Sequence, residues 1–220
     1  MALALFDLDN TLLAGDSEHA WGEFLVEVGG VDEGEFRVEN DRLYKEYLAG
    51  TLDIHESIGH QLKPLLRNPP EELHRWREQF MATRIEPMIS PAAISLVERH
   101  RAAGDVPAII TASNSFITRP IAKRFGIPDI LAVELECIGA RHTGRVLGTP
   151  TFREGKVERL REWSRDSGSD LEGSYFYSDS HNDLPLLKLV DNPVAVDPDP
   201  LLLAHAERSG WPVLSLHRSM

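Results

Sequence analysis

The spacing of apolar positions changes along the chain and divides it into distinct stretches. Residues 2–8 form a short continuous apolar run, which is typical of a parallel strand covered on both faces. From about residue 16 to residue 86, charged segments with helical periodicity follow one another, and Leu73, Trp76 and Phe80 recur at a spacing that lines one helix face. The pattern predicts helices over 16–28, 32–48 and 53–66 and a fourth from residue 69.

Strands and helices alternate after residue 90. Helices are predicted over 91–103, 116–125, 154–166 and 184–189. Strands are predicted over 106–111, 130–135, 174–178, 192–196 and 211–216, with a glycine-punctuated hairpin over 137–148. This alternation predicts an α/β fold, a Rossmann-like parallel sheet with helices on both faces. Residues 15–86 are then a helical domain inserted after the first strand, and residues 1–14 and 87–220 form the core.

Charge and cysteine content narrow the class of protein. The chain has 220 residues and a formal net charge of −12, with scattered basic residues, so we expect no nucleic-acid partner, because that binding needs clustered Lys and Arg. The single Cys137 excludes an internal disulfide and fits a reducing cytoplasm. No basic region precedes the first apolar run, which soon reaches carboxylates. We therefore expect neither a signal peptide nor a membrane span and predict a cytoplasmic protein.

Polar residues follow three of the predicted strands. Asp7, Thr111 and Asp179 each stand at the carboxyl end of an apolar run, and Asp9 and Asp183 come soon after. Because ligands bind beyond the carboxyl ends of parallel strands, we expect these residues to face one crevice. Several carboxylates gathered there would repel one another unless a cation lay between them. Mg²⁺ is predicted, because it prefers oxygen ligands, takes few carboxylates and also coordinates phosphate oxygens.

The same residues resemble, in order, the four motifs of the haloacid dehalogenase superfamily. These are DLDNT at 7–11, Thr111 at the end of AIIT, Lys156 in REGKVERL, and Asp179 with Asp183. The resemblance covers the whole predicted core, and the helical insertion resembles the cap of the phosphoserine-phosphatase-like branch, subfamily IB. Two places depart from that branch. Ala112 and Ser113 stand where it often has glycines, and the fourth motif reads SDSHND where it often reads GDGxND.

The resemblance implies a magnesium-dependent phosphomonoesterase that acts on a small metabolite. Asp7 would attack phosphorus and form an aspartyl-phosphate, which splits one difficult displacement into two easier ones. Asp9 would protonate the departing alkoxide and later take a proton from the attacking water. Thr111 and Lys156 would hold the phosphoryl oxygens. Asn10 is a further candidate for phosphate binding, although it also fits a loop-shaping role.

The magnesium ion would be held by carboxylates and one backbone oxygen. The expected ligands are Asp7, the backbone carbonyl of Asp9, Asp179, and Asp183, the last directly or through water. A histidine metal site is disfavoured, because the chain has no cysteine cluster and His55 and His60 are too far apart to share a helix face.

Two acidic residues near the predicted junction of core and cap are candidates for substrate binding. Asp16 stands where the resemblance implies a carboxylate that meets a substrate amino group, and Glu18 is near enough to share that role. A helix-capping role for Asp16 fits equally well. His181, inside the fourth motif, could touch substrate or face solvent. We expect an amine-bearing substrate, with histidinol phosphate slightly preferred to O-phosphoserine because the second and fourth motifs depart from the phosphoserine-enzyme pattern.

Three other functions fit part of this pattern. A phosphotransferase or mutase would pass the same aspartyl-phosphate to a hydroxyl acceptor. A phospho-acceptor signalling module also uses a strand-end aspartate, but Asp9 and the cap disfavour it. A lipid-phosphate phosphatase fits the motifs, yet no membrane segment or basic amphipathic helix supports it. The expected partner is a small-molecule phosphate ester, bound by a monomer or a homodimer.

Overall fold

Seven strands form one sheet in the computed structural model, which describes residues 2–217. The strands are Leu3–Phe6 (β1), Val106–Asn114 (β2), Asp129–Ile138 (β3), Arg141–Leu147 (β4), Tyr175–Ser178 (β5), Asn192–Val196 (β6) and Val213–Leu214 (β7). Their order is β4-β3-β2-β1-β5-β6-β7, and every neighbouring pair is parallel except β3 with β4. The predicted parallel α/β sheet is confirmed, with β1 at its centre.

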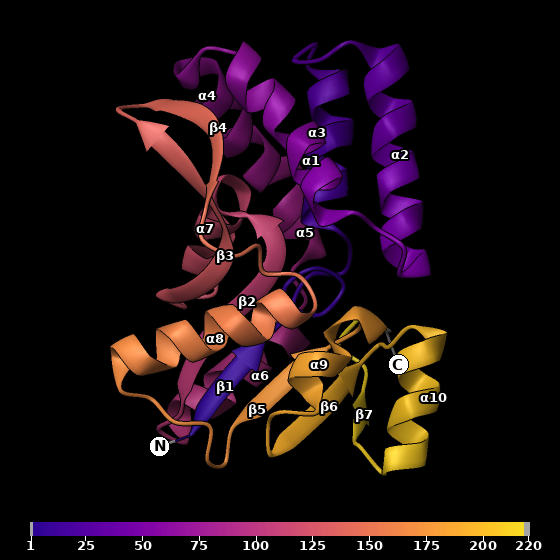
Figure 1. The fold of residues 1–220 in the computed structure, drawn as a ribbon, viewed down its shortest axis with the longest axis vertical. Helices are drawn as coiled ribbons and strands as arrows, with labels where there is room; N and C mark the ends of the chain where they lie inside the picture. The colour runs from indigo at the N-terminus through magenta and orange to yellow at the C-terminus, as the bar shows by residue number, and fades with distance from the viewer. Residues whose placement is uncertain (1, 218–220) are drawn as a thin grey trace.

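Helices cover both faces of the sheet. One face carries α8 (Glu154–Ser167), α9 (Leu184–Leu187) and α10 (Pro200–Ser209), and the other carries α6 (Pro91–Ala102) and α7 (Ser115–Arg124) (Figure 1). Alternate residues of β1 serve the two faces, because successive side chains of a strand point to opposite sides. Leu3 and Leu5 join the apolar cluster of α8 and α9, whereas Ala4 and Phe6 join that of α6 and α7. This double burial explains the continuous apolar run.

The chain between β1 and α6 carries a helical insertion above the carboxyl edge of the sheet (Figure 1), and residues 15–86 are here called the cap. Its helices are Ser17–Glu27 (α1), Glu33–Ala49 (α2), Ile54–Arg67 (α3) and Pro70–Phe80 (α4), followed by a π-helical turn, Met81–Ile85 (η1), and a short helix, Glu86–Met88 (α5). Asp16, Asp32 and Asp53 accept backbone N–H bonds at the starts of the first three helices. The predicted cap after the first strand is confirmed.

The base of the cap packs on the core through aromatic rings. Trp21 of α1 lies edge-on to Phe80 of α4, with 5.1 Å between ring centroids, and 6.0 Å from Phe116 of α7. Trp21 and Phe80 are almost completely buried. The cap and the core therefore share one apolar cluster. Burial of such large rings contributes strongly to stability.

Some element boundaries differ from the sequence prediction. β2 continues past Thr111 to Asn114, and its pairing with β3 shifts register between Ile110 and Asn114. The apolar run stops at Thr111, so its pattern could not indicate this irregular extension. Helix α10 was not predicted, although Asp199 caps it and Pro200 occupies its first turn. No helix within residues 2–217 is long and apolar enough to cross a membrane.

Candidate active site

A buried lysine joins two of the predicted carboxylates at the carboxyl edge of the sheet. Asp7 follows β1 directly, Lys156 lies in the first turn of α8, and Asp183 ends η2 (His181–Asp183) after β5. Lys156 Nζ lies 2.8 Å from Asp7 Oδ1 and 2.7 Å from Asp183 Oδ2. Asp183 Oδ2 also accepts a hydrogen bond from Ser178 Oγ at 2.7 Å. These four side chains come from distant parts of the chain, and each is at most 3% exposed.

The approach of α8 to the sheet edge depends on Gly155. A Cβ atom at this position would lie 2.0 Å from the carbonyl oxygen of Pro150, so a side chain would force the backbone apart. The absence of one lets the first turn of α8 fold close against the preceding loop. The next residue, Lys156, is thereby held where its ammonium group reaches the carboxylates.

Thr11 links the first and fourth motifs. Its hydroxyl oxygen lies 3.5 Å from Asp7 Oδ2 and 3.3 Å from Asp179 Oδ1, and it accepts the backbone N–H of Asp179 at 3.0 Å. Both carboxylates therefore border the same small space.

Asp9 is held by two donors, one from the cap junction and one from β2. Asp9 Oδ1 accepts the backbone N–H of Ser17 at 2.6 Å, and Asp9 Oδ2 accepts the hydroxyl of Ser113 at 2.6 Å. The role of Ser113 was not predicted. The sequence signal was present in the departure from glycine two residues after Thr111, but a glycine position does not indicate what a serine there will contact.

Thr111 and Asn10 occupy different surroundings. Thr111 is buried and lines the same cavity as Asp7 and Asp9, and its hydroxyl oxygen accepts the backbone N–H of Ser113 at 3.2 Å. Asn10 adopts the left-handed conformation, with φ of 57°, and its N–H donates to the carbonyl of Gly15 at 2.9 Å. Asparagine tolerates this conformation better than most residues, so Asn10 shapes the loop after Asp9.

Burial raises the pKa of three carboxyl groups at this edge. Desolvation raises the pKa of Asp7 to about 7 despite the charge of Lys156, and the pKa of Asp9 to about 7 with help from the charge of Asp16. Desolvation, with the charges of Asp7 and Asp183, raises the pKa of Asp179 well above its usual range. A single lysine thus does not compensate the negative charge that these carboxylates would carry when ionised.

This excess of buried oxygen donors is suited to a hard divalent cation. Oxygen ligands without nitrogen or sulfur favour Mg²⁺ or Ca²⁺ over zinc. Within residues 2–217, no three His, Cys, Asp or Glu side chains are already arranged as a closed metal site. Mg²⁺ does not need three, because it keeps several waters and binds one or two carboxylates together with substrate oxygens.

A cavity between the cap and the sheet edge adjoins these residues, here called the cap cavity. Its core side is formed by Asp7, Asp9 and residues 111–113, and its cap side by residues of α1, α2 and α3 with the turns beside them. Asp16 and Glu18 both line it. Asp16 also caps α1, because its side chain accepts the backbone N–H of His19 at 2.7 Å. The predicted capping role is therefore confirmed. Glu18 Oε1 accepts the side-chain amide of Asn114 at 2.6 Å.

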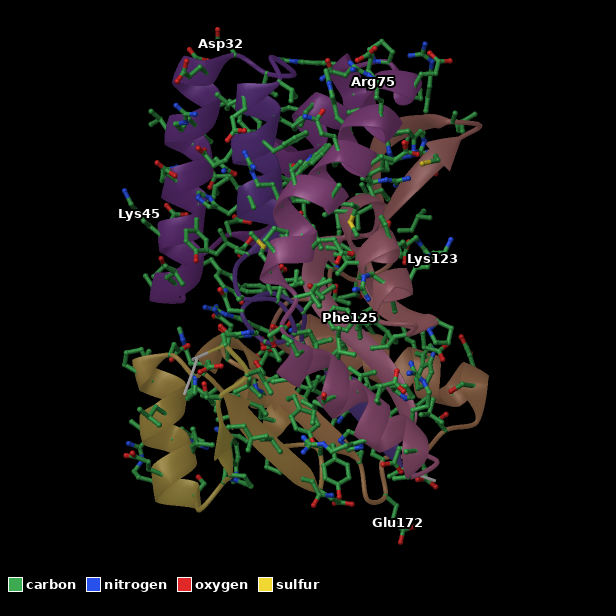
Figure 2. The ribbon with its side chains drawn as sticks, turned by 180° about the vertical axis from the view of Figure 1, so that it is seen from behind. Asp32, Lys45, Arg75, Lys123, Phe125 and Glu172 are labelled. Atoms are coloured by element: carbon green, nitrogen blue, oxygen red, sulfur yellow. The ribbon has the colours of Figure 1, made fainter. Side chains whose placement is uncertain are left out.

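The wall of the cap cavity is acidic. Burial and the charge of Asp16 raise the pKa of Glu18 to about 8, and burial raises the pKa of Asp16 to about 6. None of the described residues that line the cavity is lysine or arginine. On the nearby α2, Arg42 instead forms ion pairs with three glutamates, and Lys45 projects away from the protein (Figure 2).

His181 lies at the boundary between cap and core, outside the lining of the cap cavity. Its Nδ1 lies 2.7 Å from Asp199 Oδ2, and a Cβ on Gly50 of the cap would meet its Nε2 at 2.4 Å. Beside it, Asn182 donates to the carbonyl of Tyr47 at 3.0 Å, and Arg153 donates to the carbonyl of Gly50. These residues hold the carboxyl end of α2 against the core.

Comparison with known proteins identifies relatives over nearly the whole chain. Residues 4–188 match the model of the haloacid dehalogenase-like hydrolase family. A histidinol-phosphatase of Neisseria meningitidis is 46% identical over 217 residues, which are 97% of this chain and 98% of the relative.

Two solved structures share the fold. A protein of unknown function from Bordetella pertussis is 44% identical, with a TM-score of 0.91 and 98% of each chain covered. A phosphoserine phosphatase that carries an analogue of its phospho-aspartyl intermediate is 20% identical, with a TM-score of 0.70 over 99% of this chain and 94% of that one. The predictions of a Rossmann-like α/β fold and of a phosphoric monoester hydrolase are confirmed. The chain belongs to the haloacid dehalogenase-like hydrolase family.

Proposed function

We propose that this protein is a magnesium-dependent phosphatase that hydrolyses a small amine-bearing phosphomonoester through an aspartyl-phosphate, with histidinol phosphate as the preferred substrate. One observation carries the proposal. A lysine-bridged pair of buried carboxylates adjoins a cavity whose cap side presents two acidic groups and, among residues 2–217, no lysine or arginine. The first feature suits a phosphate group, and the second suits a cationic leaving group.

Asp7 acts as the nucleophile in this proposal. Lys156 holds Asp7 Oδ1, which fixes the rotation of the carboxylate and leaves Oδ2 to approach phosphorus. As the bond from Asp7 to phosphorus forms, the bond from phosphorus to the ester oxygen breaks. Lys156 and the Thr111 hydroxyl stabilise the negative charge on the phosphoryl oxygens, which is the largest contribution that a protein makes to this kind of transfer.

Asp9 moves the protons in both half-reactions. It donates a proton to the departing ester oxygen, and then it accepts a proton from the water that attacks the aspartyl-phosphate, releasing inorganic phosphate and restoring Asp7. A pKa of about 7 is suited to both tasks at neutral pH. The Ser113 hydroxyl can donate to the ionised form and accept from the protonated form, so it accommodates both states.

The magnesium ion would be held by Asp7, Asp179 and the backbone carbonyl of Asp9, with Asp183 contributing directly or through water. When bound, it supplies positive charge that draws phosphoryl oxygens to the sheet edge and offsets the carboxylates. Thr11 supports this set by touching both Asp7 and Asp179.

The charge of the cap cavity favours histidinol phosphate over O-phosphoserine. Both substrates carry an amine that Asp16 and Glu18 would bind. Only O-phosphoserine also carries a carboxylate on the leaving group, and this anion would lie in a cavity with four acidic lining residues and no basic lysine or arginine among the described residues. Like charges at such short range are unfavourable. The relative named histidinol-phosphatase, at 46% identity, agrees with this preference.

The cap, residues 15–86, would close over the substrate on a core of residues 1–14 and 87–220. The hydrogen bonds from Arg153 and Asn182 to the carbonyls of Gly50 and Tyr47 join these two parts at the carboxyl end of α2. Closure excludes bulk water and selects the leaving group.

The Asp7→Asn variant tests the proposal. We expect it to lose magnesium-dependent release of phosphate from both phenyl phosphate and histidinol phosphate, and to form no acid-stable labelled phosphoenzyme. The exposed Asp166→Asn variant is the matched control and keeps both activities. Intact turnover in Asp7→Asn would remove Asp7 from the nucleophile role. Faster transfer from wild-type phosphoenzyme to added alcohols than to water would identify a phosphotransferase instead.

A further inference from the structure

A glutamine in the cap has a buried side-chain oxygen without a partner. Gln61 of α3 lines the cap cavity and is 6% exposed. Its Oε1 has no hydrogen-bond partner among residues 2–217. A buried acceptor without a donor destabilises a protein, so Gln61 Oε1 would gain from a donor group on a bound ligand.

The orientation of the Gln61 amide is fixed by a chain of hydrogen bonds that starts at a backbone carbonyl. Asn40 Nδ2 lies 3.1 Å from the carbonyl oxygen of His19, which can only accept. Asn40 must therefore direct its amide nitrogen to His19 and its Oδ1 to Gln61. Because Asn40 Oδ1 can only accept, Gln61 must direct its Nε2 to it, at 3.4 Å. This leaves Gln61 Oε1 without a partner among the described residues. Gln61, a residue of the cavity lining, thus holds an acceptor that cannot rotate into a donor without breaking this chain.

The close packing of α1 and α2 maintains this chain. Asn40 is 2% exposed and occupies the space beside Gly22, where a Cβ atom would lie 2.6 Å from the Asn40 amide. Asn40 Nδ2 also lies 3.1 Å from His19 Nδ1, so the imidazole of His19 is oriented by the same amide. Glycine at position 22 is required for Asn40 to reach both groups.

Flat side chains stand on the same wall of the cavity. The ring of His19 stacks on that of Tyr44, with 4.5 Å between centroids and 18° between planes. Both residues line the cap cavity. A stacked pair of rings beside a fixed acceptor is suited to a planar group that carries an N–H donor.

We propose that Gln61, held by Asn40 and flanked by the His19–Tyr44 stack, is the specificity-determining residue for a nitrogen heterocycle on the leaving group. This inference rests on the proposed function and deepens it, because Asp16 and Glu18 bind the amine and Gln61 accepts a hydrogen bond from a ring N–H. The substrate class is an amino-alcohol phosphate whose side chain is a flat N–H heterocycle such as imidazole. An equally large ring without N–H would leave Gln61 Oε1 unpaired.

Three phosphates separate the parts of this proposal in the wild-type protein. Histidinol phosphate carries the amine and the ring N–H, phenylalaninol phosphate carries the amine and a ring without N–H, and phenyl phosphate carries no amine. We expect kcat/KM for histidinol phosphate to exceed that for phenylalaninol phosphate by about tenfold to a hundredfold, the range of one buried hydrogen bond. Equal values would overturn the role of Gln61 and leave the amine phosphatase intact. Turnover of phenyl phosphate alone would instead overturn the proposed substrate and, with it, this inference.

The Gln61→Leu variant assigns the preference to the residue. We expect the ratio of kcat/KM between histidinol phosphate and phenylalaninol phosphate to fall to about one, mainly through a rise in KM for histidinol phosphate. The exposed Gln79→Leu variant makes the same chemical change on α4 and should retain the wild-type ratio. A preference that survives in Gln61→Leu overturns the proposal. Because a ratio within one variant is measured on folded enzyme alone, partial unfolding does not mimic the expected result.

Discussion

Buried polar groups have hydrogen-bond partners at the sheet edge, whereas some buried polar groups of the cap have none among residues 2–217. At the sheet edge, Asp7 and Asp183 share the ammonium group of Lys156, and Asp9 accepts hydrogen bonds at both oxygens. In the cap, Gln61 Oε1 and both ring nitrogens of His60 have no partner among residues 2–217. Polar groups buried without partners are rare in folded proteins. The sheet edge therefore follows the usual rule, and the cap departs from it at Gln61 and His60.

The difference indicates a division of labour between the two regions. In the proposed function, the edge carries out a step that is common to any phosphate ester, and a preorganised network suits that step because it needs no rearrangement when charge develops. In the same proposal, the cap contacts the leaving group, which differs between phosphate esters, and polar groups without partners gain most from a ligand that supplies those partners. The cap also carries the buried His60, which does not line the cavity.

Removal of Lys156 should produce the largest effect. In Lys156→Met, Asp7 and Asp183 lose their shared cation, and breaking a buried ion pair costs about 3–5 kcal/mol of unfolding free energy. Loss of one preorganised charge also lowers kcat by on the order of 10³-fold. Urea titration and turnover of phenyl phosphate with magnesium measure the two effects.

The matched control for this change is Lys188→Met, which removes an exposed lysine just after α9. It should leave both the unfolding free energy and the turnover near their wild-type values. A Lys156→Met protein as stable and as active as this control would show that the network at the sheet edge is not a preorganised unit.

The sequence predicts the sheet edge better than the cap. Parallel strands end at one edge, so the spacing of apolar runs is enough to bring Asp7, Thr111 and Asp179 near one another. The cap depends on how α1, α2 and α3 cross, and helical periodicity identifies a buried face without specifying its neighbour. The contact of Asn40 with Gln61 could therefore not be predicted. His19 at the start of α1 likewise has no sequence signal that pairs it with Tyr44.

The next largest effect is expected for the charge on the cap wall. Glu18→Gln keeps an oxygen for the Asn114 amide but loses the negative charge. We expect kcat/KM for histidinol phosphate to fall about 10- to 100-fold, the range of a charge-assisted hydrogen bond, and to fall much less for phenyl phosphate. The exposed Glu35→Gln variant on α2 is the control. Equal losses with both substrates would indicate a structural role for Glu18.

The raised pKa of Glu18 gives this prediction an independent measurement. A pKa of about 8 leaves the free carboxyl mostly protonated at pH 7. Binding of the ammonium group of histidinol should ionise it, because an adjacent cation favours the charged form. Calorimetry of histidinol binding in buffers of different ionisation enthalpy should then detect release of about one proton. This proton release should be absent in Glu18→Gln.

The buried His60 should make the protein sensitive to acid. It stacks on Phe36 and is 2% exposed, and desolvation together with the charge of Lys63 lowers its pKa from 6.5 to about 4. The unfolded chain takes up a proton near pH 6.5, whereas the folded protein resists protonation down to about pH 4. Acid therefore favours the unfolded chain, and this group removes about 2 kcal/mol of stability between pH 7 and pH 5.

Replacement of His60 tests this sign. His60→Leu should remove most of the loss between pH 7 and pH 5, as measured by urea titration at several pH values, and should leave stability at pH 7 little changed. The control His55→Leu removes an exposed histidine from the same helix and should retain the wild-type pH dependence. A His60→Leu protein with an unchanged slope would show that His60 is not held neutral by its surroundings.

The smallest effect is expected for Ser113, the hydroxyl donor that β2 supplies at the sheet edge. Ser113→Ala removes the hydroxyl that orients Asp9 Oδ2 and leaves the Ser17 N–H on Oδ1. A carboxyl group held at one oxygen can still rotate toward the ester oxygen, so kcat should fall only about tenfold. KM should change little, because Ser113 binds Asp9 and not the phosphate in this proposal. The exposed Ser167→Ala variant is the control. A rise in KM with an unchanged kcat would show that Ser113 contacts the substrate directly. Ser113 would then belong with the substrate-binding residues of the cavity wall and not with the network at the sheet edge.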